Sequence, residues 1–141
     1  MTTISYNHKD KEIAVDSRLT ECDLIITDND DKFIEKEGIT FFLCGGYSAS
    51  YLLVDVYLGT ETDKENLDAN IILIEDGKLF CVSYLDGSIN KWSIEHDTAW
   101  GSGEKFALAA MDFGCSAEEA VKYAMTRDIY TGGEVKVIEV K

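Results

Sequence analysis

The first three residues, Met1-Thr2-Thr3, offer a self-contained catalytic pair. If Met1 is removed, Thr2 becomes the amino-terminal residue, and a small second residue is what methionine removal generally requires. The Thr2 hydroxyl is then a nucleophile, and its α-amine, which titrates near pH ~8 in a free chain, is a weak base on the same residue. No other stretch of the sequence offers a comparable pair. The alternative interpretation is that Thr2 and Thr3 are ordinary β-formers that open an amino-terminal strand.

A threonine hydroxyl needs further groups before it can cleave a peptide bond. A base must take its proton, either directly or through a water molecule. A cation must keep that base neutral, carboxylates must hold the cation, and backbone N–H groups must stabilise the oxyanion. The sequence offers candidates for these parts, and its pattern predicts the elements that position them.

The composition predicts one domain over residues 1–141. The chain has 141 residues, of which 45% are hydrophobic, enough for a buried core. Its net charge of −14 and pI near 4.4 argue against nucleic acid or an anionic membrane as a partner, because Lys and Arg make most contacts to phosphates. We find no signal peptide and no stretch of ~20 apolar residues, so we expect a soluble, cytoplasmic protein.

The four cysteines are predicted to be reduced core thiols. They lie far apart, without a Cys-x-x-Cys motif and without a histidine at metal-ligand spacing; they are Cys22, Cys44, Cys81 and Cys115. This pattern is typical of a cytosolic protein rather than of a disulfide framework. We therefore expect no metal and no cofactor.

Two short β-prone runs open the chain. Residues 4–8 and 12–16 are separated by a polar stretch, which predicts a hairpin. The second strand contains Ile13-Ala14-Val15, which is apolar enough to be buried on both faces. A chain that begins with a strand inside a sheet has a fixed amino terminus, as a nucleophile at Thr2 requires.

The rest of the pattern predicts an α+β protein with a mainly antiparallel sheet, or pair of sheets, covered by helices. Residues 59–68 are predicted to be a loop or one weak turn. The Asp76-Gly77 pair between apolar runs predicts a type I′ hairpin turn. Ser116 and Glu119 predict a capping box. The other predicted elements are strands at 39–44, 70–75, 79–84, 89–95 and 134–140, and helices at 48–58, 101–111 and 116–127.

Several motifs resemble the successive signatures of proteasome β-type subunits and the bacterial HslV peptidase. The resemblance covers nearly the whole chain in the right order, and its most specific piece is the carboxy-terminal run followed by a strand. The motifs are Thr2-Thr3-Ile4, Ile13-Ala-Val-Asp16-Ser-Arg18-Leu-Thr20, Lys32-Phe33, Gly101-Ser102-Gly103 and Arg127-Asp128-Ile-Tyr130-Thr131-Gly132-Gly133.

The resemblance implies the four-layer αββα sandwich of N-terminal nucleophile (Ntn) hydrolases, with a reduced helical layer after residue 58. It also implies that Asp16 and Lys32 are the acid–lysine pair beside the nucleophile. A buried ammonium close to the α-amine would keep that amine unprotonated by like-charge repulsion, and Asp16 would keep Lys32 charged and aimed.

The resemblance further implies that Ser102, Asp128 and Thr131 lie behind Thr2 and orient the amino terminus. Each of these residues also has an ordinary interpretation. Ser102 could be a helix cap and Asp128 a helix-end or turn carboxylate, just as Lys32 and Asp16 could be a solvated surface pair. The ordered set of motifs favours the catalytic interpretation.

The resemblance implies that the oxyanion and the substrate are bound near Gly45. It gives the oxyanion donor as the backbone N–H of a glycine, and Gly45 lies at the expected distance after Lys32. A competing register instead puts Phe42 at the donor position. Gly46 and Thr20 complete the residues predicted to bind the oxyanion or the substrate.

The leading hypothesis is a self-compartmentalising threonine peptidase that assembles a ring from identical subunits. An ATP-driven unfoldase is implied as a partner by analogy alone. A second hypothesis is a non-catalytic assembly or binding module of the same fold that retains Met1. A third is a small-amide Ntn amidohydrolase.

Overall fold

The computed structural model describes residues 1–60 and 69–141. These residues form three helices and three antiparallel sheets, which confirms the predicted α+β class. In chain order the elements are β1 (Thr3–Asn7), β2 (Glu12–Val15), β3 (Leu19–Glu21), β4 (Leu24–Thr27), β5 (Phe33–Lys36), β6 (Ile39–Leu43), α1 (Tyr47–Tyr57), β7 (Ala69–Glu75), β8 (Lys78–Leu85), β9 (Ser88–Ser93), β10 (Thr98–Gly101), α2 (Glu104–Asp112), α3 (Ala117–Met125) and β11 (Lys136–Glu139).

Backbone contacts group the chain into two compact units. The first unit contains residues 1–32 and 95–140, and the second contains residues 33–94 with residue 141. The single domain over residues 1–141 stays a prediction. Most of the predicted loop at 59–68 lies outside the described residues. The predicted reduction of the helical layer after residue 58 falls on the same stretch and stays a prediction.

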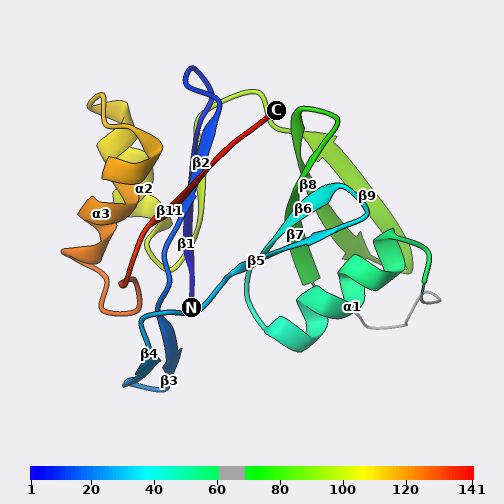
Figure 1. The fold of residues 1–141 in the computed structure, drawn as a ribbon, viewed down its shortest axis with the longest axis horizontal. Helices are drawn as coiled ribbons and strands as arrows, with labels where there is room; N and C mark the ends of the chain where they lie inside the picture. The colour runs from blue at the N-terminus through cyan, green and yellow to red at the C-terminus, as the bar shows by residue number, and fades with distance from the viewer. Residues whose placement is uncertain (61–68) are drawn as a thin grey trace. The chain divides into compact units, whose positions relative to one another are not determined.

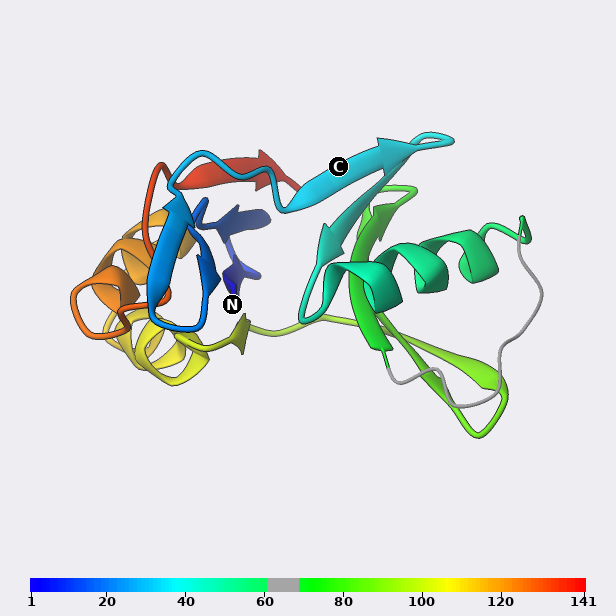
Figure 2. The same cartoon turned by 90° about the horizontal axis from the view of Figure 1, so that it is seen from below.

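The first unit is built on a four-stranded sheet in the order β10-β1-β2-β11. The predicted hairpin is confirmed, because β1 pairs with all of β2, from Ile4 opposite Val15 to Asn7 opposite Glu12. Ile13, Ala14 and Val15 are all fully buried, as the apolar run predicted. Helices α2 and α3 lie together on one face of this sheet in both views (Figures 1 and 2), and α3 packs on β1 and β2.

Small side chains let α2 and α3 approach each other and the sheet. Ala107, Ala110, Ala120 and Ala124 form one buried cluster with Met111. The first turn of α3 is closed by the predicted capping box, because the Ser116 hydroxyl accepts from the Glu119 N–H and the Glu119 carboxylate accepts from the Ser116 N–H. This pairing fixes where α3 begins.

The second unit is a five-stranded meander in the order β5-β6-β7-β8-β9, with α1 packed against β6 and β7 (Figure 2). Its core contains large apolar side chains from strands and helix, including Phe41, Leu53 and Leu73. Burying each such side chain contributes roughly 1.5–3 kcal/mol. Three of its hairpins use the same two-residue turn, at Glu37-Gly38, Asp76-Gly77 and Asp86-Gly87.

Both residues of each turn have positive φ, between 50° and 79°, which is the conformation of a type I′ turn. The prediction at Asp76-Gly77 is thus confirmed. The other two turns carry the same acidic-residue–glycine signal and were not predicted.

The structure corrects one prediction about the cysteines. All four thiols are free, as predicted, and Cys81 is buried, which raises the pKa of its thiol to about 11. Cys22, however, is exposed, and Cys44 and Cys115 are only partly buried, so the prediction of a core thiol is confirmed for Cys81 and is wrong for Cys22. Cys22 lies at the tip of the β3–β4 ribbon with a φ of 53°, where its side chain points away from a core. Among the described helices, none is long and apolar enough to cross a bilayer.

Candidate active site

The amino terminus is held in the first unit by a paired strand. β1 lies between β10 and β2, and the Thr2 carbonyl accepts a hydrogen bond of 2.9 Å from the Ser102 N–H. Thr2 itself is only 4% exposed. The position of Thr2 is therefore fixed by the paired strand that follows it and by the Ser102 N–H, as a nucleophile at this residue requires.

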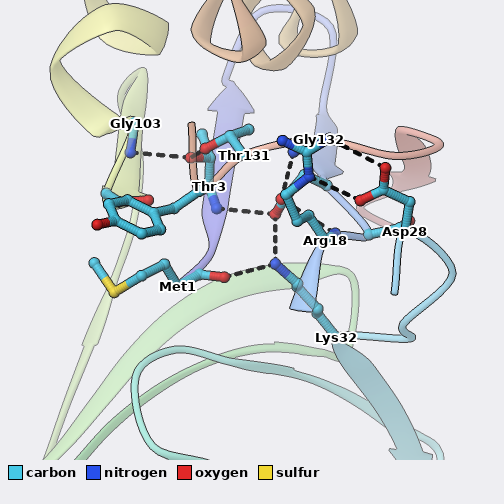
Figure 3. A network of polar contacts seen from close by, with 12 residues as sticks. Met1, Thr3, Arg18, Asp28, Lys32, Gly103, Thr131 and Gly132 are labelled. Atoms are coloured by element: carbon cyan, nitrogen blue, oxygen red, sulfur yellow. Dashed lines mark hydrogen bonds and ion pairs between the residues drawn. The ribbon is translucent and has the colours of Figure 1, made fainter. Parts of the chain in front are cut away.

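Asp16 and Lys32 form a buried ion pair beside Thr2. Their side chains have no exposed surface, and Lys32 Nζ lies 2.9 Å from Asp16 Oδ1. The same ammonium donates a hydrogen bond of 2.7 Å to the Met1 carbonyl (Figure 3). Because that carbonyl belongs to the Met1–Thr2 peptide bond, the Lys32 charge lies next to the backbone nitrogen of Thr2.

The Asp16 carboxylate is fixed by further donors. The Thr3 N–H donates to Oδ1 at 3.0 Å, and the Gly132 N–H donates to Oδ2 at 3.1 Å. The Arg18 N–H makes a longer contact of 3.4 Å to Oδ2. A buried ion pair is tolerated when its remaining acceptors are satisfied in this way. The pair is therefore a preorganised charge rather than a surface contact, so the solvated-pair interpretation of Lys32 and Asp16 does not apply.

A second polar cluster joins Ser102, Asp128 and Thr131. The Ser102 and Thr131 hydroxyls each donate to Asp128 Oδ2 at 2.6 Å. The Thr131 hydroxyl has one hydrogen, and it donates that hydrogen to Asp128. The Thr3 hydroxyl, 2.6 Å from Thr131 Oγ1, is therefore the donor in the bond between the two threonines. Thr3 in turn accepts from the Gly103 N–H at 3.0 Å. The three predicted residues are thus brought together next to the strand that carries Thr2.

The Asp128 carboxyl is held in its ionised form. Burial would raise the pKa of this carboxyl, but hydrogen bonds from Ser102, Thr131 and the Tyr130 N–H, with the positive amino terminus, bring it below its ordinary value of 3.8. Asp128 is 9% exposed, so it is largely shielded from water. A shielded carboxylate close to the amino terminus can orient an ammonium or an amine there.

The Gly101-Ser102-Gly103 motif is explained by close approach. A Cβ atom on Gly101 would lie 1.6 Å from the Thr2 carbonyl oxygen, and one on Gly103 would lie 2.4 Å from the Thr3 hydroxyl. Real side chains do not come so close, so both positions require glycine. The two glycines therefore allow β10 and the start of α2 to pack closely on Thr2 and Thr3, and the Ser102 hydroxyl between them donates to Asp128.

Arg18 and Asp28 fix the two-stranded ribbon of β3 and β4 to the site. The Arg18 guanidinium binds the Asp28 carboxylate at 2.8 and 3.1 Å and donates to the Ile129 carbonyl at 2.9 Å. This pairing raises the pKa of Arg18 and lowers that of Asp28. The bidentate contact joins the two ends of the ribbon, and the hydrogen bond to the Ile129 carbonyl ties it to the loop that contains Thr131.

Sequence reasoning assigned no role to several residues of this network. Thr3, Arg18 and Gly132 stood within the quoted motifs, but no separate pattern indicated what they contact. Asp28 stood in a polar turn, where acidic residues are common. The missing signal was the pairing of residues far apart in the chain, since Gly132 bonds to Asp16 and Thr131 to Thr3.

Thr20 lines an open hollow beside the amino-terminal residue. The hollow has a volume of about 390 Å³, and its lining residues are Met1, Thr20, Cys22 and Tyr130. The Tyr130 hydroxyl donates to the Asp23 carboxylate, which holds the ring at one wall. A space of this size next to Met1 can accept a side chain of a bound peptide.

Gly45 and Gly46 lie in the second unit, in the turn between β6 and α1. Gly45 has a φ of +79°, and Gly46 is the N-cap of α1. Phe42, the competing oxyanion residue, is a fully buried residue of β6 and pairs with both β5 and β7. Because β6 is paired on both sides, the N–H of Phe42 serves the sheet, which favours the register with Gly45. The oxyanion role of Gly45 stays a prediction.

The comparisons with known proteins find a shared fold without a shared sequence family. No protein-family model matches the chain, and no curated protein matches it significantly. A solved structure of Thiobacillus denitrificans BPH in complex with epoxomicin is similar with a TM-score of 0.67, 18% identity and coverage of 99% of each chain. A second structure of Thiobacillus denitrificans BPH has a TM-score of 0.64 at 18% identity, covering 99% of this chain and 98% of that one. This chain has the fold of that protein along its whole length.

The site itself contains no set of metal ligands. Within residues 1–60 and 69–141, no group of three or more His, Cys, Asp and Glu side chains could hold a metal ion. The polar groups that surround Thr2 in the described residues are hydroxyls, carboxylates and the buried Lys32 ammonium.

Proposed function

We propose that this chain is a threonine peptidase of the proteasome-like Ntn-hydrolase fold, with Thr2 as its nucleophile after removal of Met1. The observation that carries the proposal is the fully buried Lys32 ammonium, held by Asp16 and bonded to the carbonyl of the Met1–Thr2 peptide. A charge is costly to bury, and here it stands beside the one residue whose hydroxyl and amine could act together.

In the proposed reaction, hydrolysis of the Met1–Thr2 bond by an aminopeptidase first frees the Thr2 amine. Lys32 then loses its carbonyl acceptor and turns a hydrogen toward the Thr2 hydroxyl. The free amine takes the hydroxyl proton, and Thr2 Oγ attacks the substrate carbonyl. The leaving amine of the substrate takes that proton, which leaves an ester on Thr2. Water then hydrolyses the ester and regenerates the hydroxyl.

The second cluster would position the amine in this reaction. Asp128 carries a negative charge, and Ser102 donates to it from directly beside the Thr2 carbonyl. Asp128 would orient the new amino terminus, with Ser102 and Thr131 fixing the carboxylate. Gly45 would supply the oxyanion N–H, and the hollow beside Thr20 would receive a substrate side chain.

The complex of Thiobacillus denitrificans BPH with epoxomicin supports this chemistry by analogy. Epoxomicin is an epoxyketone, whose ketone and epoxide are two electrophiles that can react with a hydroxyl and an amine of one residue. We extend the same reactivity to Thr2. A ring of identical subunits and an ATP-driven unfoldase partner belong to the proposal by the same analogy.

A non-catalytic binding module is the second candidate, and one contact favours it. With Met1 in place, the Met1 carbonyl occupies Lys32 and Thr2 has no free amine. A chain that keeps Met1 would therefore lack the proposed base and would be inactive.

Intact mass spectrometry with epoxomicin separates the two candidates. We expect the native protein to lack Met1 and to gain the mass of one epoxomicin on Thr2. Thr2→Ala should fold normally, gain no mass and lose hydrolysis of a fluorogenic peptide. Thr126→Ala changes an exposed threonine outside the site and is the matched control, which should label like the wild type.

The critical sample is protein shown to lack Met1. If that sample neither reacts with epoxomicin nor hydrolyses peptides, the peptidase proposal is wrong. If the native protein keeps Met1 and stays unlabelled, the binding module is the better assignment. Lys32→Met in the Met1-free protein should lower kcat at least ~100-fold, because the amine and hydroxyl lose the charge that tunes them.

A further inference from the structure

The hollow of about 390 Å³ beside Met1 has one rigid wall, which is the ring of Tyr130. Both ends of this residue are held. Its backbone N–H donates to Asp128 Oδ1 at 3.2 Å, and its hydroxyl donates to Asp23 Oδ1 at 3.0 Å. A wall that is fixed before a ligand arrives needs little ordering on binding, so the hollow is a preorganised subsite.

The Asp23 carboxylate gives this wall a negative charge. Asp23 is exposed, and within the described residues it forms no ion pair with a Lys, Arg or His side chain. The basic residue closest to it in sequence is Arg18, whose guanidinium is already bound to Asp28. The hydrogen bond to Asp23, the Asp23 charge and the Asp128 charge all raise the pKa of the Tyr130 hydroxyl. The ring is therefore flanked by negative charge that no cation of the described chain offsets.

The rest of the lining suits a long apolar stem. Cys22 and the Tyr130 ring both present apolar surface to the hollow. Lysine and arginine lay such a stem along apolar surface and keep the charged head free to bind an anion. The face of an aromatic ring attracts the same cation. An acidic side chain would instead meet the Asp23 charge, and like charges placed together are rejected.

We propose that this hollow selects a lysine or arginine side chain of the peptide substrate, and that Asp23 is the residue that sets this preference. The stem of the substrate side chain lies on the Tyr130 ring, and its cationic head pairs with the carboxylate of Asp23. Removal of Met1 takes away one wall and opens the hollow toward Thr2. The inference rests on the proposed peptidase function, because it names the substrate class of that same site.

The expected preference is modest because Asp23 is exposed to water. An exposed ion pair and a cation over an exposed ring each contribute little, so together they should favour arginine about 5- to 10-fold in kcat/KM. Salt screens such a pair, and the preference should fall to about 2-fold in ~1 M salt. Hydrogen-bond donors alone would not show this salt dependence.

Internally quenched peptides measure the preference in Met1-free protein. The peptides differ in a single residue, which is arginine, citrulline or glutamate, and this residue is placed in turn at each position around the scissile bond. Citrulline has the shape of arginine without its charge. We expect one position at which arginine is cleaved faster than citrulline and citrulline faster than glutamate, with mass spectrometry locating the cut.

Asp23→Asn tests the assigned residue. Asparagine keeps an oxygen that can accept from the Tyr130 hydroxyl but has no charge, so the ratio of arginine to citrulline should fall to within about 2-fold of unity. Glu21→Gln is the matched control. Glu21 is exposed and removes the same charge, but side chains alternate along a strand, so it faces away from Thr20 and Cys22. This control should keep the wild-type ratio.

Binding to Met1-free Thr2→Ala separates this inference from the proposed function. This variant cannot cleave, so fluorescence anisotropy with labelled arginine and citrulline peptides reports the subsite alone. Cleavage by the wild type without an arginine preference would overturn the inference and leave the peptidase assignment standing. Absent cleavage with Asp23-dependent binding of the arginine peptide would do the reverse. A preference that Glu21→Gln lowers as much as Asp23→Asn would trace it to overall acidity and overturn the inference.

Discussion

The two units bury different kinds of side chain. Of nine buried polar or charged residues in the described chain, eight lie in the first unit, and Ser50 lies in the second. The eight are Thr2, Thr3, Ser5, Asp16, Ser17, Lys32, Asp128 and Thr131. The second unit instead buries a continuous apolar cluster built on Phe41, Leu53 and Leu73.

The first unit contains the polar residues of the candidate active site, whereas the second unit is mainly an apolar scaffold. A buried ion pair is weak evidence for stability, because well-packed apolar residues in its place are often neutral or stabilising. Within the described residues, every buried side-chain nitrogen and oxygen atom has a hydrogen-bond partner. The first unit therefore holds polar groups in fixed positions, whereas the second gains stability from apolar packing.

The largest expected effect comes from breaking the ion pair. Asp16→Ala leaves the Lys32 ammonium buried without its partner, and we expect the free energy of unfolding to fall by about 3–5 kcal/mol. Urea denaturation measures this loss. The matched control is the double variant Asp16→Ala with Lys32→Met, which should recover much of the stability because no charge is left unpaired. A double variant as unstable as Asp16→Ala would contradict this account.

Breaking the apolar core should cost nearly as much for a different reason. Leu53→Ala leaves a cavity in the second unit, with an expected loss of about 2–5 kcal/mol in urea denaturation. Lys32 and Asp16 are untouched, so labelling of Met1-free protein by epoxomicin below the unfolding transition should persist. Loss of labelling at a urea concentration where the variant remains folded would argue against this separation of roles.

Acid should weaken the first unit through Asp128. The folded pKa of this carboxyl lies below its ordinary value of 3.8, so its contribution is present above about pH 4 and is lost as pH falls through the folded pKa. The stability difference between the wild type and Asp128→Asn should therefore shrink between pH 6 and pH 2. For Leu53→Ala, which removes no titratable group, the difference from the wild type should stay nearly constant over the same range.

The smallest expected effects compare one buried serine from each unit. The Ser5 hydroxyl donates to the Ala117 carbonyl at 2.7 Å, and the Ser50 hydroxyl donates to the Cys44 carbonyl at 2.9 Å. Ser5→Ala and Ser50→Ala each remove one such bond, and we expect each to cost about 1 kcal/mol by thermal or urea denaturation. A much larger loss for Ser5 would mean that the polar network of the first unit acts cooperatively.

The sequence predicted local elements well because their signals are local. The capping box at Ser116, the hairpin turn at Asp76-Gly77 and the buried strand at Ile13-Ala14-Val15 each depend on residues close in the chain. The pairs Glu37-Gly38 and Asp86-Gly87 carry the same local signal for a type I′ turn, so these two hairpins were also predictable from the sequence. These elements could be predicted from propensity and pattern alone.

The site needed information that pattern does not contain. Asp16, Lys32, Ser102, Asp128 and Thr131 were predicted as a set from resemblance, and the structure brings them together in the first unit. The hydroxyl chain from Thr3 through Thr131 to Asp128 depends on the contact between Thr3 and Thr131, which are 128 residues apart in sequence, and no local period encodes such a contact.

The strand order of the first sheet joins residues that the ribosome makes at very different times. β1 is made first, but its neighbour β10 and the edge strand β11 are made last, as are Ser102, Asp128 and Thr131. While the ribosome adds the residues between β1 and β10, on the order of 10 s at typical rates, the strand and the Ser102 N–H that hold Thr2 in the finished sheet do not yet exist. If Thr2 is the nucleophile, as we propose, we expect an aminopeptidase to act on Met1 during translation, before β10 forms and Ser102 binds the Thr2 carbonyl.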